Sequence, residues 1–220
     1  MTNRGPPDTI WPMSIIRIQS VRDPFNTPNI ARIAVTTLGR AEAMGLLPKD
    51  ETIDCLDFTA FRRVVEGISR AGIGHGLLAD LTSSRSRDSQ QLTALLYKLN
   101  HALEESPVPT YEWPRLVAIL GVELLARLVG ISPSSVRRYQ AGTRPTPDEV
   151  AACLHFLALA VGDLAGAYND IGIRRWFERK RTPLGDRSPA ELLVGKWCPE
   201  DPGPTQVRQL AHSLVSSPAT

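Results

Sequence analysis

Cysteine is scarce in this chain. Only three of its 220 residues are cysteines, and neither CxxC nor CxxH spacing occurs at Cys55, Cys153 or Cys198. A zinc finger needs such pairs and a disulfide framework needs a denser set, so both classes are excluded. We therefore expect a reduced, cytoplasmic protein without a metal site.

Catalytic constellations are also lacking. The chain has four histidines in separate segments, none of them in an HExxH pair: His75, His101, His155 and His212. The glycine-rich run GIGHG at 72–76 has neither the lysine and hydroxyl of a P-loop nor GxGxxG spacing, which predicts a plain loop. We expect no enzymatic activity, no catalytic residue and no cofactor.

Every apolar run long enough to span a membrane is interrupted by polar residues. The N-terminal segment MTNRGPPDTIWP lacks the apolar core of a signal peptide. The most apolar stretch, at 150–168, contains His155 and Asp163. We expect this stretch to be a helix buried in a core or a dimer interface, and we expect no membrane partner.

The chain also lacks a large excess of charge of one sign, since its net charge is +2. Nucleic-acid binding needs only a local basic face, and two local excesses occur. No acidic residue separates the members of the first, Arg127, Arg137, Arg138 and Arg144. The second, at 174–181, is opposed only by Glu178 and is compatible with DNA backbone, an acidic partner or a solvated helix end.

Helical periodicity is what the sequence does contain. Apolar residues recur at helical spacing from 29 to 44, Asp57 stands at an N-cap position before 58–72, and a third helix begins near Asp88. Residues 81–89 are polar and predict an exposed loop. Residues 1–28 predict a flexible arm with one short extended piece near Ile15 to Ile18. No alternation is long enough to predict a sheet, so the expected fold class is all-α.

Three prolines in SPVPTYEWP, at 106–114, mark the expected domain boundary, because proline resists both helix and central strand. A lead-in helix then starts around Trp113. We predict a helical N-terminal domain at 29–106, a helix-turn-helix region at 112–148 and a small helical domain at 149–216.

The stretch VELLARLVGISPSSVRRYQAG, at 122–142, meets the steric demands of a helix-turn-helix. Ala126 is small where two helices cross, and Gly130 tolerates positive φ in the turn. Ser132 is the expected N-cap of the second helix, Pro133 lies in its first turn and Gly142 ends it. The inward positions are apolar or aromatic: Leu125, Val129, Ile131, Val136 and Tyr139.

The outward positions carry side chains that reach base edges and phosphates. This pattern predicts binding of double-stranded DNA, and two half-sites predict a homodimer. The alternative is an αα-corner whose arginines are a solvated face. The predicted DNA-binding residues are Arg127, Ser132, Ser134, Ser135, Arg137, Arg138, Gln140, Thr143 and Arg144.

Downstream, GIRRWFERKRTPLGDRSPAELLVGKW, at 172–197, places an aromatic-containing helix before a turn with Pro183, Leu184 and Gly185. Arg187, Ser188, Pro189 and the pair Leu192 and Leu193 follow. With a helix-turn-helix ahead of it, this order resembles the Xre/MbcA/ParS antitoxin family, over residues 112–216.

The resemblance implies a repressor of its own operon. It also implies that the C-terminal region covers the active site of a RES-domain toxin that consumes NAD. The final helix at 207–214 and six further residues would form or support the toxin-facing surface: Trp176, Leu184, Pro189, Leu192, Leu193 and Trp197.

Read from its residues alone, the same run is a small helical subdomain. Trp176 and Phe177 form a buried anchor, and Ser188 with Glu191 forms a capping box. About 110 residues precede the helix-turn-helix, and they are candidates for dimerisation, ligand sensing or binding of another protein. A transcription regulator without a toxin is therefore the alternative function, and a purely structural interaction protein is a third.

Overall fold

The computed structural model describes residues 16–47, 52–83 and 89–216. The chain is mostly helical (66%), with eleven α-helices and one small two-stranded sheet among these residues. The predicted helical character is confirmed, and the expectation of an all-α chain needs one correction, the sheet.

The sheet pairs β1 (Ile16–Val21) with β2 (Ile53–Leu56) in parallel. Cα partners run from Ile16 and Ile53 at one end to Val21 and Leu56 at the other. A strand of four residues cannot display a clear alternation, which is why periodicity did not predict it. β1 and the buried Phe25 lie within the expected arm at 1–28, of which residues 1–15 lie outside the described residues.

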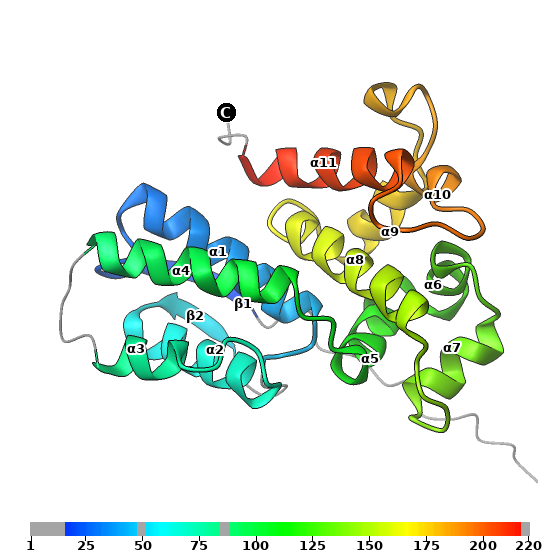
Figure 1. Ribbon diagram of the computed structural model, residues 1–220. Helices are drawn as coiled ribbons and strands as arrows, with labels where there is room; N and C mark the ends of the chain where they lie inside the picture. The colour runs from blue at the N-terminus through cyan, green and yellow to red at the C-terminus, as the bar shows by residue number, and fades with distance from the viewer. Residues whose placement is uncertain (1–15, 48–51, 84–88, 217–220) are drawn as a thin grey trace, which may run out of the picture.

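The first helices are α1 (Pro28–Ala43), α2 (Phe58–Arg70), α3 (Leu77–Ser83) and α4 (Ser89–Glu104). α1 and α4 lie side by side above α2 and α3 (Figure 1). The side chain of Asp57 accepts a hydrogen bond from the backbone N–H of Ala60 at 2.9 Å, as predicted for the N-cap of α2. The loop expected at 81–89 is partly helical, since residues 81–83 end α3 and residue 89 begins α4, and residues 84–88 lie outside the described part.

The second half of the chain is organised around α8 (Asp148–Leu164). Before it come α5 (Pro109–Leu120), α6 (Val122–Val129) and α7 (Pro133–Gln140). After it come α9 (Asp170–Glu178), a 3-10 turn η1 (Thr182–Leu184), α10 (Pro189–Leu192) and α11 (Pro202–Ser216). Within the described ranges, no helix has the length and apolar character to cross a membrane.

α5 corrects the expectation that prolines keep 106–114 out of helix. Pro109 stands in its first turn, where the missing N–H costs nothing, and Pro114 lies inside the helix. Trp113 and Leu116 are buried on either side of Pro114. Burial of these side chains outweighs the one backbone hydrogen bond that Pro114 removes.

α1 and α8 touch backbone to backbone. A Cβ added to Gly39 would lie 2.8 Å from the carbonyl oxygen of Gly162, and one added to Gly162 would lie 2.9 Å from Cα of Arg40. The buried apolar side chains of both halves form one continuous cluster. Buried apolar side chains thus pack together from both sides of residues 106–114. The domain boundary at 106–114 stays a prediction.

Candidate nucleic-acid interface

The two short helices α6 and α7 meet as a helix-turn-helix requires. Gly130 ends α6 with φ +75°, and the N–H of Ile131 donates to the carbonyl of Ala126 at 3.0 Å. Ala126 is buried at the crossing, and Val136 and Tyr139 on α7 are buried. Each expected inward residue is buried except Ile131, which is half-buried.

α5 supports this pair as a third helix. The Trp113 ring stacks on Tyr139 with centroids 5.6 Å apart, and its Nε1–H donates to Oγ1 of Thr146 at 2.9 Å. The contact ties the C-terminal end of α7 and the following loop to a buried side chain. These contacts fix the orientation of α7 on the side that faces α5, and the opposite side of α7 is open to solvent.

The solvent face of α7 gathers most of the predicted DNA-binding residues. Ser135 and Gln140 are half-buried. The others are exposed: Arg127, Ser132, Ser134, Arg137, Arg138, Thr143 and Arg144. A short helix with this exposed polar face has the dimensions and chemistry to enter a major groove.

Two arginines of the predicted interface have acidic partners that the local sequence did not indicate. Nη2 of Arg137 lies 3.4 Å from Oε1 of Glu123 on α6, and Nη2 of Arg127 donates to Oε1 of Glu178 on α9 at 2.9 Å. All four side chains are more than half exposed. Such surface pairs contribute about 0–1 kcal/mol, so a phosphate can displace either acid.

Arg138 and Arg144 form no ion pair with an acidic side chain in the described ranges. Nε of Arg138 lies 3.4 Å from the carbonyl oxygen of Ser134, and the guanidinium of Arg144 lies 5.7 Å from the ring centroid of Tyr139. Both side chains are held near α7 while their charge stays accessible. They are the strongest cationic candidates on this face.

Ser132 has a positioning role in the free protein. Its Oγ accepts from the backbone N–H of Ser135 at 3.2 Å and lies 2.9 Å from the hydroxyls of Ser134 and Ser135. The hydroxyl caps α7, as the sequence predicted. Thr143 likewise donates to the backbone carbonyl of Arg138 at 3.1 Å, which orders the chain just after the helix.

The residues that the resemblance assigned to a toxin surface lie mostly inside the protein. Only Leu192 is half-buried, and Trp176, Leu184, Pro189, Leu193 and Trp197 are buried. The five buried side chains could support a surface from inside the protein, but their burial does not allow direct contact with a partner. Trp197 donates from Nε1 to the carbonyl of Leu128 at 2.9 Å, which ties this segment to α6.

In the described ranges, no group of three or more histidine, cysteine, aspartate or glutamate side chains could hold a metal ion. Burial raises the pKa of the Cys153 thiol to about 11, and this thiol donates to the carbonyl of Trp197. His155 is buried between Glu112 and the carbonyl of Glu104.

Comparison with known proteins adds no assignment to this geometry. No protein-family model, no curated protein and no solved structure matches the chain.

Proposed function

We propose that this chain is a DNA-binding transcriptional repressor of antitoxin type that reads double-stranded DNA with α7. The observation that carries the proposal is the exposed row on α7 and the turn after it, in which Arg138 and Arg144 have no acidic partner among the described residues. Arginine pairs with guanine through two parallel hydrogen bonds, and serine and threonine suit phosphates. α7 and the turn that follows it present these groups together.

A homodimer is part of this proposal. An eight-residue helix covers few base pairs, so one copy buries little surface on DNA. Two copies on half-sites one helical turn apart raise both affinity and specificity. Sedimentation of the free chain and of its DNA complex measures this, and a monomer in both would contradict it.

The first experiment selects duplexes from a random DNA library with the tagged full chain and measures affinity for the enriched sequence by fluorescence anisotropy. The double variant Arg137→Ala/Arg138→Ala should abolish specific binding, because each lost bidentate contact costs about 1–3 kcal/mol. Arg62→Ala removes an exposed arginine from α2 and should bind as the unchanged chain does.

Affinity should fall steeply with rising salt, since phosphate contacts release counterions. If no sequence is enriched, or if the double variant binds like the Arg62→Ala control, α7 does not read DNA. The αα-corner with solvated arginines is then the better interpretation.

Neutralisation of a RES-domain toxin is the second element of the proposal and rests on the resemblance at 172–197. One further observation favours a protein partner there: Val194 is 64% exposed in the short segment that the buried Leu193 and Trp197 hold in place. Purification of the tagged chain from its native cell tests this element. Recovery of DNA without a toxin would support the stand-alone regulator.

A further inference from the structure

A cavity of about 530 Å³ lies where α1, α4 and α11 meet. Its volume is in the range of pockets that hold small molecules. Glu104 is the only acidic residue among the described residues that line it. The basic or titratable nitrogen groups that line it come from all three helices: Arg32, Arg40, Lys98, His101 and His212.

Arg40 is the central residue of this cavity and is only 3% exposed. Its Nε lies 3.4 Å from Oδ1 of Asp163, while Nη1 contacts Oδ1 of Asn100 at 3.2 Å and Oε1 of Glu104 at 2.8 Å. These three contacts involve three of the five N–H donors of the guanidinium. A buried arginine that lines a cavity with donors to spare retains donor capacity for a ligand.

Two further basic side chains, Arg208 and His212, lie close to Arg40. Arg208 on α11 pairs with Asp163 and lies 3.9 Å from Oε1 of Glu104. Burial and then the charge of Arg40 lower the pKa of Arg208 to about 10. Burial, followed by Arg208 and Arg40, also lowers the pKa of His212, whose Nδ1 lies 3.3 Å from Oδ2 of Asp163. In both cases burial is the larger cause, and the charge of the neighbouring guanidiniums adds to it.

We propose that this cavity binds a small polyanion through its carboxylate or phosphate oxygens. The oxygens would accept hydrogen bonds from Arg40, Arg32 and Lys98, and Arg32 and Lys98 are exposed at the rim. In the free protein Glu104 forms an ion pair with Arg40, and the side chain of Glu104 is 43% exposed. An entering anion displaces Glu104 toward solvent, and the carboxylate competes with the ligand for Arg40.

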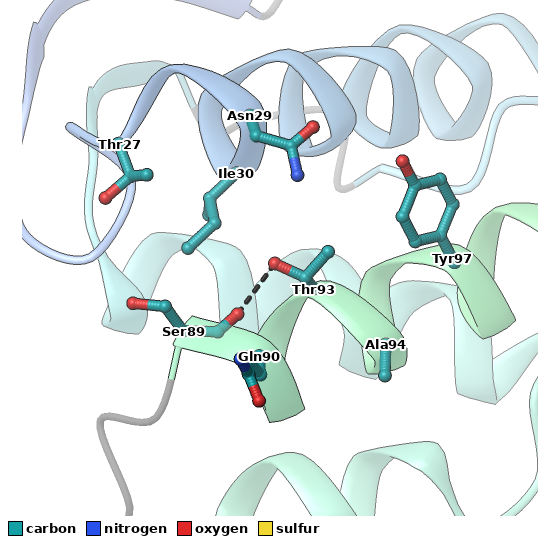
Figure 2. A pocket seen from close by; sticks show the side chains of 8 residues that line it. All are labelled: Thr27, Asn29, Ile30, Ser89, Gln90, Thr93, Ala94 and Tyr97. Atoms are coloured by element: carbon teal, nitrogen blue, oxygen red, sulfur yellow. Dashed lines mark hydrogen bonds between the residues drawn. The ribbon is translucent and has the colours of Figure 1, made fainter.

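A neighbouring cavity of about 460 Å³ between α1 and α4 provides the contrast. Figure 2 shows its lining, in which the hydroxyl of Thr93 donates to the backbone carbonyl of Ser89 within α4. Among the residues that the structure describes, no lysine, arginine or acidic residue lines it. The two cavities share Tyr97, so the anionic group is expected at the Arg40 end of this surface.

Isothermal titration calorimetry of the full chain in 150 mM NaCl, on the order of physiological ionic strength, tests the proposal with citrate and with pyrophosphate. Arg32→Gln/Lys98→Gln should weaken binding at least about tenfold, since two charge-assisted hydrogen bonds are lost. Glu104→Gln should tighten binding, because the competing charge is removed. Arg175→Gln/Lys196→Gln removes the same charge from exposed sites in the C-terminal half and should leave binding unchanged.

Binding of citrate alone assigns a carboxylate ligand, and binding of pyrophosphate alone assigns a phosphate ligand. The tightening in Glu104→Gln is a gain that loss of folding cannot produce. No heat of binding for either anion, or equal weakening in both double variants, would overturn the proposal. The titration needs no DNA, so its failure leaves the role of α7 untouched.

Discussion

Glu112 shows how one buried residue makes stability depend on pH. It is fully buried on α5, its Oε1 lies 2.6 Å from Nδ1 of His155, and its Oε2 has no partner among the described residues. The carbonyl of Glu104 only accepts, so Nε2 of His155 donates to it at 3.0 Å, while Nδ1 faces Glu112. Burial raises the pKa of Glu112 above its ordinary 4.5, and the hydrogen bond from His155 opposes this shift.

A raised pKa in the folded state means that Glu112 contributes most stability below pH 4.5, and that this contribution is lost as pH rises through the folded value. Glu112→Gln mimics the protonated acid and does not titrate. We expect the free energy of unfolding of the unchanged chain to fall, relative to Glu112→Gln, as the pH rises above 4.5, because the buried carboxyl is more easily ionised in the unfolded chain.

Urea unfolding at a series of pH values measures this difference, and Glu149→Gln, exposed at the start of α8, serves as the control. Parallel stability curves for the unchanged chain and Glu112→Gln would contradict a raised pKa for Glu112 in the folded chain.

At the scale of elements, the turn between α6 and α7 depends on a second contact that helix-turn-helix patterns do not include. Gly130 has φ +75°, and a Cβ there would lie 2.3 Å from the carbonyl oxygen of Gly195. Gly142, which follows α7, has φ +67° and no atom within 4 Å of its added Cβ. The two glycines therefore share a backbone conformation and differ in contact.

We predict that Gly142→Ala lowers the free energy of unfolding by about 1–2 kcal/mol, the cost of a left-handed backbone for alanine. Gly130→Ala should cost several kcal/mol, because a backbone carbonyl cannot move aside as a flexible side chain does. Chemical denaturation of both variants gives the comparison. An equal decrease in the free energy of unfolding for both variants would mean that the segment around Gly195 does not pack against the turn.

α5 and the small sheet show where element prediction from sequence fails. Pro114 signals a helix end, yet α5 continues through it because Trp113 and Leu116 are buried. β2 is too short to show a period of two, and its pairing with β1 depends on a crossover that includes α1. In both cases tertiary burial outweighs local preference.

At the scale of the whole molecule, the close approach of α1 to α8 joins the first and second halves of the chain. Gly162 faces the backbone of Arg40 and Gly39, and Asp163 next to it pairs with Arg40. A methyl group at 162 would separate the helices and disturb this ion pair. Gly166, just beyond α8, has open space around an added Cβ and offers a matched control.

Gly162→Ala is expected to destabilise the chain by about 1–3 kcal/mol, the usual cost of overpacking, and Gly166→Ala should be near neutral. Hydrogen exchange of α1 amides, compared with those of α9, reports whether the N-terminal helices loosen first. Unchanged protection of α1 in Gly162→Ala would show that the two halves do not depend on this contact.

The sequence alone determined the positions of most helices, the caps at Asp57, Ser132 and Ser188, and the inward and outward faces of the pair α6 and α7. These features depend on residues within a few positions of one another, so periodicity and capping chemistry reveal them.

Only the tertiary structure decided which charges of the candidate interface remain unpaired, because Glu123 and Glu178 reach Arg137 and Arg127 across helices. It also decided the pairing of the two strands, and the ion pairs that join Arg40 and Arg208 to Glu104 and Asp163 next to the cavity. Each of these contacts joins residues distant in the chain, and side-chain burial and helix packing, which no local pattern records, bring them together.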